Sequence, residues 1–597
     1  MPTSIATRVD QLRQWLEAQQ LEAWIVSTSD EHLNEYVPEH NQRLAALTGF
    51  TGSLGTAVIM REGRPQLFVD SRYHLQAEQS CGVLFDLQKQ GNSGVLDPHE
   101  WLAEQPGSLR IGSDPFVTAP HTWRRFAKAL VGTTHTLTAV HPNPADAIWP
   151  LRPAPPRNPI YPLGEEFTGK TTSQKLEELR TTMQEAKTGV LILTLLDEIA
   201  WLANLRGSDI AHNPVFEAYA VITDTGATCF CHHPESGLQD ARPEWKFRAY
   251  SDYLGFLKEL AQREGLQVWL DPSGTTMGTR QAFADKQVHE AKNPVVLAKA
   301  LKNSIELECS RTAHRRAASA LVRSFVKLRN ALDSGTAVSE RKYSDWLREE
   351  YSSEEGFADL SFTSIVGSGA NGAIVHYGNP SPEKCLEPGE MLLVDSGIQC
   401  AGATTDATRT IAVSNASNLQ RRRYTRVLQA HIRLAQQVFP EGTTGAALDA
   451  ITRSSLWNDG LDFGHGTGHG VGAFLGVHEG PQRISPVSHD VSLQEGMIVS
   501  NEPGFYETGW GGIRIENLCV VVKAEGHPPH PGGKHWLQLE TLTLVPYELA
   551  LIDHSLLNPD EREWLDAYQT RVLEEIGPLL PDKPHQRWLE QACAACK

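Results

Sequence analysis

Residues 391–413 read MLLVDSGIQCAGATTDATRTIAV, two apolar runs joined by a loop rich in glycine and threonine. Such runs, bounded by turn residues, predict two neighbouring β-strands. Asp395 ends the first strand and Asp406 begins the second. Either aspartate alone is typical of a solvated turn, but two acids on facing strands are costly to bury unless they are paired or bind a metal. The stretch therefore predicts a strand pair that carries a carboxylate site.

A second stretch, residues 496–522, reads GMIVSNEPGFYETGWGGIRIENLCVVV and carries two more acids on apolar strands. Glu502 follows one strand, and Glu516 lies within another whose isoleucines alternate with polar residues. Period-two alternation places Arg514 and Glu516 on one face of that strand and the isoleucines on the other. Taken alone, this pattern also fits an exposed ladder of charges. Together with Asp395 and Asp406, it indicates four converging carboxylates.

Four gathered carboxylates repel one another and resist ionisation. Two divalent cations would leave the cluster nearly neutral. A set of oxygen ligands with one imidazole suits manganese, cobalt, zinc or iron. It does not indicate a zinc site of the thiolate type. Acids that bridge two ions ~3.5–4 Å apart give a metal-bound hydroxide at neutral pH. The sequence thus predicts a dinuclear metal centre.

Three histidines are set among glycines in residues 465–481, HGTGHGVGAFLGVHEGP. His465 and His469 have the spacing of the helical zinc motif H-E-x-x-H, but the glutamate is missing and the glycines disfavour a helix. Each histidine alone is compatible with a packing or turn role. Beside four acids, we expect one histidine to be a metal ligand and the other two to handle protons.

Residues 141–163 contain eight prolines, which predicts an extended linker without helix. The flanking segments resemble each other: a helix pattern, an apolar strand and two further strands recur in the same order. Helix and strand repeated in this way indicate two similar α/β domains. A long helix is expected from about Asn303. The predicted domains are residues 1–155, residues 156–302 and a catalytic portion at residues 303–597.

The formal net charge of −18 argues against a nucleic-acid or anionic-membrane partner. The amino-terminal residues show a helical pattern and no signal-peptide core, and no apolar run is long enough to span a bilayer, so we expect a soluble cytoplasmic protein. Nine cysteines are scattered along the chain. The clusters CFCHH (229–233) and CAACK (593–597) are interpreted as structural, without zinc, redox or prenylation chemistry.

Several motifs closely resemble the three-domain Xaa-Pro aminopeptidase (aminopeptidase P) group of pita-bread metallopeptidases. They are DSG (395–397), TTDATRT (404–410), HGTGHGVG (465–472), VHEGP (477–481), EPGFY (502–506) and GIRIEN (512–517). TGFTGS (48–53), DSRYHLQ (70–76) and LETLTLVPYELALID (539–553) are similar as well, so the resemblance spans nearly the whole chain. It implies two amino-terminal α/β domains before a pita-bread catalytic domain, and a homodimer.

The resemblance also implies roles for individual residues. Asp395 would chelate one metal ion, Asp406 and Glu516 would bridge two, and His469 and Glu502 would complete the other; the usual metal is Mn²⁺. Substrate contacts are implied for Arg72, His376, His469 and His478. Catalytic or supporting roles are implied for Glu502, His465, His478, Tyr506 and Arg514.

The implied reaction releases the amino-terminal residue from peptides with proline in second position. A metal-bridging hydroxide would attack the carbonyl, Glu502 would shuttle the proton, and His478 or His376 would stabilise the oxyanion. Three alternatives stay open: a prolidase that cleaves Xaa-Pro dipeptides, a metal-free creatinase-like enzyme, and a non-catalytic pita-bread module that binds peptides. All five expected metal ligands are present, which weighs against the last two.

Overall fold

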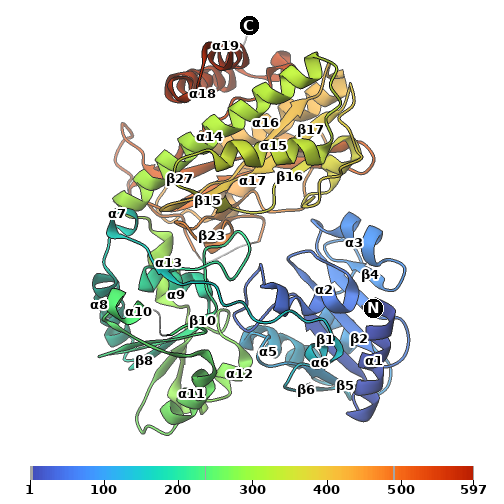
Figure 1. Ribbon diagram of the computed structural model, residues 1–597, viewed down its shortest axis with the longest axis vertical. Coiled ribbons are helices and arrows are strands. Elements are labelled where there is room, and N and C mark those ends of the chain that lie inside the picture. Colours follow the sequence, from blue (N-terminus) through green and yellow to red (C-terminus); the bar gives the residue numbers. More distant parts are fainter. Residues whose placement is uncertain (1–3, 235–236, 488–490, 596–597) are drawn as a thin grey trace. The chain divides into compact units, whose positions relative to one another are not determined.

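The computed structural model describes residues 4–234, 237–487 and 491–595. The chain divides into two compact units, which are described separately (Figure 1). The amino-terminal unit comprises Met1–Gly164 and Lys170–Val296. The carboxy-terminal unit comprises Glu165–Gly169 and Leu297–Lys597.

The amino-terminal unit contains two six-stranded sheets of the same topology. In order across the first sheet the strands are β4 (Asp86–Lys89), β3 (Gln66–Val69), β2 (Gly55–Met60), β1 (Ala23–Ser27), β5 (Arg110–Ser113) and β6 (Thr136–Ala139). Across the second they are β12 (Trp245–Ala249), β11 (Ala227–Cys231), β10 (Ala218–Thr223), β8 (Val190–Leu193), β13 (Val268–Leu270) and β14 (Val288–Glu290). In both sheets the two central pairings, β1–β2–β3 and β8–β10–β11, are antiparallel, and the outer pairings are parallel.

The internal repeat predicted from the sequence is therefore confirmed. Each sheet is preceded by an amphipathic helix, α1 (Ile5–Ala18) or α8 (Thr172–Glu185), whose apolar residues are buried. The other helices of this unit are α2 (Arg43–Thr48), α3 (His74–Cys81), α4 (Pro98–Ala103), α5 (Pro120–Ala129), α6 (Pro144–Ile148), α9 (Leu196–Ala203), α10 (Leu238–Ala241), α11 (Tyr253–Ala261), α12 (Met277–Arg280) and the start of α13 (Pro294–Ala300).

The proline-rich linker departs from the expectation of a fully extended segment. Helix α6 forms inside it, with Asn143 as N-cap and Pro144 in the first turn, where proline costs no hydrogen bond. Ala145 is buried in the core of the first sheet. The segment from residue 152 to 160 is free of helix, and β7 (Tyr161–Pro162) then pairs with β9 (Leu205–Arg206). The number of prolines predicted a linker without helix, and this prediction is wrong for residues 144–148.

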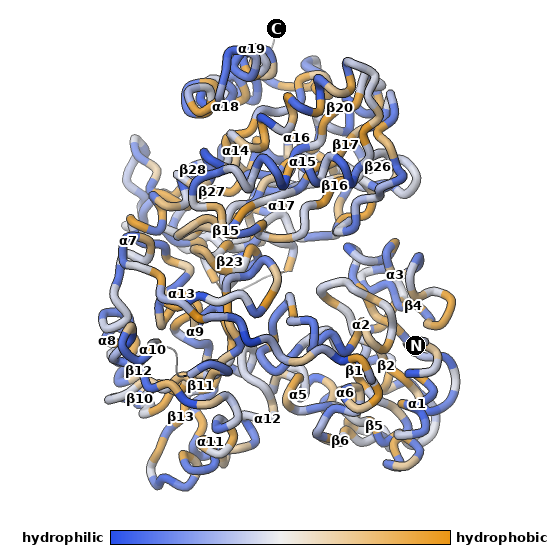
Figure 2. Tube along the Cα trace, viewed as in Figure 1, coloured by the Kyte–Doolittle hydropathy of each residue, from blue (hydrophilic) through white to orange (hydrophobic). Residues whose placement is uncertain are grey.

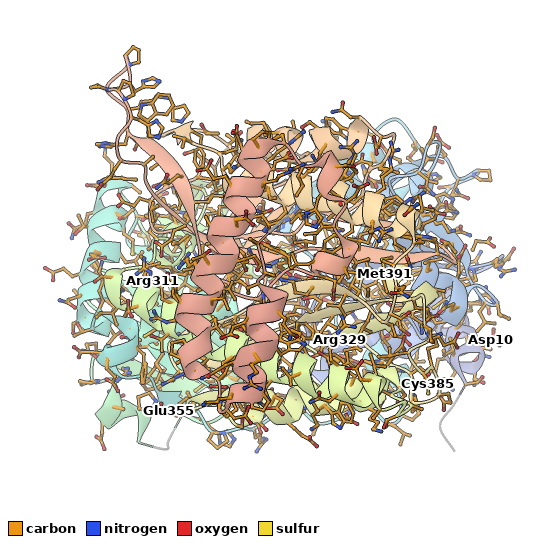
Figure 3. The ribbon with its side chains drawn as sticks, turned by 90° about the horizontal axis from the view of Figure 1, so that it is seen from above. Asp10, Arg311, Arg329, Glu355, Cys385 and Met391 are labelled. Carbon is orange, nitrogen blue, oxygen red and sulfur yellow. The ribbon has the colours of Figure 1, made fainter. Side chains whose placement is uncertain are left out.

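The carboxy-terminal unit begins with the predicted long helix. Helix α14 (Ser304–Asp333) is capped by the Asn303 side chain, which accepts hydrogen bonds from the backbone N–H groups of Ile305 and Glu306. Arg311 and Arg329, labelled in Figure 3, tie the two ends of α14 to Glu540 and Glu548. The remaining helices are α7 (Glu165–Thr168), α15 (Glu340–Ser352), α16 (Asn418–Ala435), α17 (Gly445–Trp457), α18 (Pro559–Ile576) and α19 (Lys583–Ala592).

The strands of this unit form two main sheets and two smaller ones. One main sheet has the order β16 (Ile365–Ser368), β17 (Met391–Ser396), β20 (Ala407–Ala412); the other has the order β21 (Phe439–Pro440), β28 (Trp536–Thr541), β27 (Asn517–Lys523), β24 (Ile498–Asn501), β22 (Gly468–Gly470), β23 (Glu479–Ile484). The smaller ones are β15 (Phe357–Leu360), β18 (Ile398–Cys400), β19 (Ala403–Thr404) and the ribbon β25 (Gly504–Glu507), β26 (Gly511–Arg514).

Helices cover the main sheets on their apolar side. Buried residues of α14, α15, α16 and α18 pack against β17 and β20 in one continuous core. Along α14 and α15 hydrophobic and hydrophilic residues alternate, as expected for helices with one buried face (Figure 2). The helices thereby hold the strands from one side, and polar residues of the strands can gather on the opposite side.

The structure places most of the two cysteine clusters, whose interpretation as structural stays a prediction. Cys229 and Cys231 lie on β11 and are buried, and His232 follows in a turn. Cys593 is buried at the end of α19, whereas Cys596 lies outside the described residues. In the part of the chain that the structure describes, every helix is too short or too polar to cross a bilayer.

Candidate metal centre

The five predicted metal ligands come from five places in the carboxy-terminal unit. Asp395 is in β17, Asp406 directly precedes β20, His469 is in β22, Glu502 directly follows β24, and Glu516 lies between β26 and β27. The sequence placed Glu516 within a strand. Instead, the strand is interrupted at Ile515 and Glu516, where the chain passes from the β25–β26 ribbon into the six-stranded sheet.

Strand register brings these residues together. In the antiparallel pair β17–β20, Asp395 lies opposite Thr408 and Ser396 opposite Ala407, so Asp406 is near Asp395. In the pair β24–β27, Asn501 lies opposite Asn517, so Glu502 and Glu516 meet just beyond the end of the ladder. The two acid pairs belong to different sheets. The Glu516 N–H donates to Thr408 O (3.1 Å) and joins the sheets at the site.

Ligand atoms of the five residues lie within coordination reach of one another. Three groups have all their ligand atoms within 4.8 Å: Asp395–Asp406–Glu516, His469–Glu502–Glu516 and Asp406–His469–His478. Asp406, Glu516 and His469 each belong to two groups; this is expected for Asp406 and Glu516 as bridging ligands, whereas His469 is predicted to bind one ion. The structure therefore brings together every residue that the sequence predicted as a ligand.

Burial and mutual repulsion disfavour the ionised acids. Burial raises the pKa of Asp406 well above its usual range, and the neighbouring carboxylates of Glu516 and Asp395 raise it further. The pKa of Glu516 is raised well above its usual range by burial and by the charges of Glu502 and Asp395. Burial raises the pKa of Glu502 to about 7, although the charges of Arg514 and His478 act in the opposite direction.

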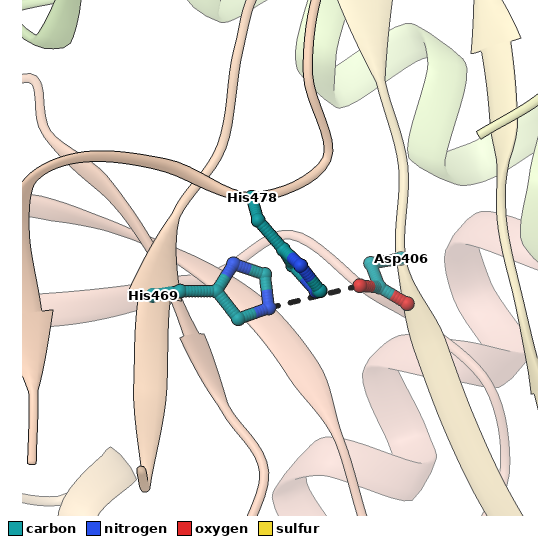
Figure 4. Close-up of side chains that lie close together, drawn as sticks. All are labelled: Asp406, His469 and His478. Carbon is teal, nitrogen blue, oxygen red and sulfur yellow. Dashed lines mark ion pairs between the residues drawn. The ribbon is translucent and has the colours of Figure 1, made fainter. Parts of the chain in front are cut away.

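His469 presents a lone pair to the acids. Its Nδ1–H donates to Gly470 O (2.9 Å), so in the neutral ring Nε2 is the unprotonated nitrogen. This Nε2 is 3.3 Å from Glu502 Oε1 and 3.9 Å from Asp406 Oδ2. Figure 4 shows the His469 ring turned toward Asp406, with His478 beside both. The neutral His469 ring can therefore offer Nε2 as a ligand to a cation that these carboxylate oxygens also bind.

The acids carry oxygens that the protein does not satisfy. Among the described residues, none donates a hydrogen bond to Asp395 Oδ1, Asp406 Oδ1 or Glu516 Oε1, although all three atoms are buried. Buried polar atoms are normally hydrogen-bonded, and buried charges are normally paired or bound to metal. Three buried oxygens without donors, beside the His469 imidazole, fit two divalent cations held by oxygen and nitrogen ligands.

A chain of hydrogen bonds supports one side of the cluster. Arg514 Nη2 donates to Asp395 Oδ2 (2.6 Å), and Arg514 Nη1 donates to the Tyr506 hydroxyl (2.7 Å). The Tyr506 hydroxyl in turn donates to His465 Nε2 (2.9 Å), because His465 Nδ1–H is engaged with Gly466 O. Ile513 and Ile515 are in the core, whereas Arg514 and Glu516 both contact the Thr408 hydroxyl. The predicted alternation of faces is confirmed.

Two further predicted histidines lie beside the acids. The His478 ring is 4.4 Å from the His469 ring and 6.4 Å from the His376 ring, measured between centroids. Gln399 Nε2–H donates to Leu475 O (2.7 Å) and the Leu475 N–H donates to Thr404 Oγ1 (3.1 Å). These bonds hold the loop before His478 to the β18–β19 hairpin.

Arg72 belongs to the amino-terminal unit, where it pairs with Asp70 (2.7 Å) and Glu35 (3.6 Å). Its role toward a substrate stays a prediction. Sequence reasoning missed Thr408 and Arg409. Arg409 is fully buried and donates to Glu516 O (2.7 Å) and Asn517 Oδ1 (2.8 Å). An arginine inside the apolar stretch TRTIAV was the signal that would have identified it.

Four family models match the chain. Residues 308–523 match metallopeptidase family M24, and residues 535–596 match the C-terminal region of peptidase M24. Residues 8–148 and 151–306 each match a creatinase/prolidase N-terminal domain. The two amino-terminal matches coincide with the two sheets of equal topology. All five converging residues lie within the M24 match.

Relatives match over the whole chain. A probable Xaa-Pro aminopeptidase P of Coprinopsis cinerea is 39% identical, covering 97% of this chain and 96% of the relative. Aminopeptidase P2 of Arabidopsis thaliana is 39% identical, covering 95% of this chain and 85% of the relative. The crystal structure of X-prolyl aminopeptidase from Caenorhabditis elegans, described as a cytosolic enzyme with a di-nuclear active site, matches with a TM-score of 0.95 at 30% identity over 100% of both chains. The expected fold, two creatinase-like α/β domains before a pita-bread catalytic domain, is confirmed, and this chain belongs to the Xaa-Pro aminopeptidase P group of metallopeptidase family M24.

Proposed function

We propose that this protein is an Xaa-Pro aminopeptidase, which releases the amino-terminal residue from peptides that have proline in second position. The observation that carries the proposal is the cluster of Asp395, Asp406 and Glu516, in which each carboxylate has one buried oxygen without a donor among the described residues. The similarity to Xaa-Pro aminopeptidases over the whole chain supports the same activity.

Five residues would hold two divalent cations at this site. Asp395 would bind one ion, Asp406 and Glu516 would bridge both, and His469 and Glu502 would complete the other. When bound, two such cations supply Lewis acidity and lower the pKa of water into the neutral range. The hydrogen bond from Thr408 Oγ1 to Glu516 Oε2 (2.7 Å) orients one bridging carboxylate and leaves its other oxygen for the ions.

The remaining polar residues would bind the peptide and move protons. Glu502 accepts the proton of the attacking water on its carboxylate and passes it to the proline nitrogen, which is a tertiary amide without an N–H. His376 and His478 donate hydrogen bonds to the scissile carbonyl oxygen. Tyr506 and Arg514 hold Asp395 and His465 in place through the bonds described above. His465 contacts the bound peptide.

Finer properties belong to the same proposal. We propose Mn²⁺ as the metal, a homodimer as the assembly and the cytoplasm as the location; the cytosolic C. elegans enzyme supports the location. We also propose the domain bounds 1–155, 156–302 and 303–597, and a substrate-binding role for Arg72. The net charge of −18 speaks against nucleic-acid partners.

Metal analysis and a peptide assay test the proposal together. The purified protein should contain about two divalent ions per chain and should cleave Arg-Pro-Pro between arginine and the first proline. Asp406→Ala and Glu516→Ala should lose both metal and turnover, whereas Asp333→Ala, which changes an exposed acid of the same unit, should lose neither. A fully active Asp406→Ala protein would refute the assignment. Preferential cleavage of the dipeptide Arg-Pro would indicate a prolidase instead.

A further inference from the structure

Glu340 is a fully buried carboxylate in the carboxy-terminal unit that the metal centre does not use. It is the first residue of α15, directly after the N-cap Ser339. Tyr343 and Leu347 of the same helix are fully buried in the core, so α15 is a rigid support. A buried carboxylate is costly unless donors surround it. Its partners therefore indicate what the position is for.

The Glu340 carboxylate accepts hydrogen bonds from a single loop, residues 368–381. Oε1 accepts from the Ser368 N–H (2.7 Å), from the Ser368 hydroxyl (3.1 Å) and from Asn371 Nδ2 (3.1 Å). Oε2 accepts from the Tyr377 hydroxyl (2.9 Å), from the Ser381 N–H (3.1 Å) and from Asn371 Nδ2 (3.2 Å). Both ends and the middle of the loop thus converge on one side chain.

The same loop carries His376, one residue before Tyr377. On the other side of His376, Val375 O accepts a hydrogen bond from Arg514 Nη2 (3.3 Å), and Arg514 also holds Asp395. His376 is therefore bracketed by two anchors. One is Glu340 on α15, and the other is the arginine that contacts a metal-binding acid.

The loop has little room to move toward the sheet. Its 3₁₀ turn (Gly369–Ala373) lies against β26, and a Cβ added to Gly512 would be 1.8 Å from Gly372 O. Close packing on one side and hydrogen bonds to a buried carboxylate on the other therefore restrain the loop backbone. The His376 ring is consequently held beside the His478 ring.

We propose that Glu340 is a positioning residue for peptide hydrolysis: it fixes the 368–381 loop so that His376 meets the scissile carbonyl. This inference rests on the proposed function, because it assigns Glu340 an effect on the same reaction. Glu340 makes no bond to the five proposed metal ligands in the described chain, so its effect passes through His376 and leaves metal binding unchanged.

Glu340→Gln tests the proposal with minimal change of shape. The amide NH₂ would face N–H donors of the loop in place of a carboxylate oxygen, and at least one loop bond would be lost. Because displacement by about 1 Å can cost ~100-fold in rate, we expect kcat/KM for Arg-Pro-Pro to fall ~10- to 100-fold at unchanged metal content. The matched control is Glu561→Gln, a buried carboxylate of α18 that accepts bonds from Gln429 Nε2 and the Asn558 N–H, both outside the loop. It should leave kcat/KM within ~2-fold of wild type.

A double-mutant cycle separates positioning from a general structural role. In a His376→Ala background, Glu340→Gln should lower kcat/KM by a further factor of less than ~2, because the group that Glu340 positions is already absent. Tyr377→Phe removes a single donor to Glu340 and serves as a milder second variant. It should lower kcat/KM in the same direction and should show little further effect in the Glu340→Gln background.

Hydrogen–deuterium exchange gives a readout that does not need activity. The Ser368 and Ser381 amides should exchange faster in Glu340→Gln than in wild type, and amides of α18 should not change. Wild-type kcat/KM in Glu340→Gln, or an equal loss with and without His376, would overturn the positioning role. A wild-type protein that fails to cleave Arg-Pro-Pro would overturn the proposed function instead, and the exchange data would still report whether Glu340 holds the loop.

Discussion

Arg514 Nη2 donates a 2.6 Å hydrogen bond to Asp395 Oδ2, and the two side chains are 2% and 10% exposed. The bond joins β26 to β17 and sets a permanent positive charge beside the acid cluster. The guanidinium simultaneously donates to the Tyr506 hydroxyl, to Thr408 Oγ1 and to Val375 O. One planar group with five donors thus orients a metal-binding acid, a tyrosine and the loop of His376.

Arg514→Lys keeps the charge but cannot reproduce this fork of donors. We expect kcat/KM for Arg-Pro-Pro to fall about 100-fold, since Asp395, Tyr506 and Val375 O cannot all be held by one ammonium group. Steady-state kinetics with metal analysis measures the effect. Arg311→Lys, which alters a half-exposed arginine paired with Glu540, should behave like wild type. Equal kinetics in Arg514→Lys would contradict the positioning role.

Asp406→Asn should stabilise the metal-free protein. In the absence of ions, burial raises the pKa of Asp406 well above its usual range, and the charges of Glu516 and Asp395 raise it further. A neutral amide removes the repulsion and should increase the unfolding free energy by about 1 kcal/mol. The melting temperature in EDTA should therefore rise by a few degrees. Adding Mn²⁺ should raise the melting temperature of wild type but not of the variant. A variant that melts below metal-free wild type would contradict the repulsion.

Lys299 and Glu479 form a buried ion pair that stabilises the segment after His478. Lys299 Nζ is 2.5 Å from Glu479 Oε2, and the side chains are 3% and 4% exposed. Lys299→Met leaves a buried carboxylate without its cation and should cost about 3–5 kcal/mol of unfolding free energy. The double variant with Glu479→Gln should recover most of that loss, as measured by urea denaturation. Equal stabilities of the single and double variants would show that the pair is not coupled.

Two buried histidines make the carboxy-terminal unit sensitive to acid. Burial lowers the pKa of His314 to about 4 and that of His431 to about 3. In the unfolded chain the imidazole pKa is about 6.5, so the unfolded state takes up protons first. The stability that the two neutral buried imidazoles allow is therefore fully present above pH 6.5. It is lost as the pH falls from 6.5 toward the pKa values of the folded state.

His314→Leu tests this acid sensitivity. Between pH 7 and pH 5 the unfolding free energy of the wild-type protein should fall by about 2 kcal/mol more than that of the variant. The variant lacks the His314 imidazole, whose protonation favours the unfolded state. Urea denaturation at the two pH values measures the difference. His585→Leu changes a histidine outside the core, paired with Asp582, and serves as control. Parallel pH dependence in wild type and His314→Leu would exclude this origin of acid sensitivity.

Much of the fold followed from local patterns. Strand segments such as GTAVIM (55–60) and AYAVITD (218–224) carry β-branched runs between turns, and they form β2 and β10. Asn303 caps α14 where the sequence indicated the start of a long helix. The convergence of the acids was predictable because four carboxylates on apolar strands have few other stable arrangements.

Other features had no local signal. The donors to Glu340 come from residues 368–381, and the partner of Lys299 is 180 positions away. In sequence, Glu340 is one acid in a charged helix, which a solvent-exposed face explains equally well. The break at Glu516 was also hidden, because residue alternation continues across Ile513–Glu516 while the hydrogen-bonding partner changes. Only tertiary packing decides such cases.

The separation of the two acid pairs along the polypeptide sets the order of events during synthesis. A nascent chain that has emerged from the ribosome only as far as β20 offers a cation just Asp395 and Asp406. The imidazole of His469 and the second acid pair arrive later, and β24 and β27 must pair before Glu502 and Glu516 face them. The contact between the two acid pairs spans 96 positions, from Asp406 to Glu502, and such a contact is slow to form. We therefore expect metal capture only after β24 and β27 have paired, and a folding intermediate that lacks this pairing should be isolated without bound metal.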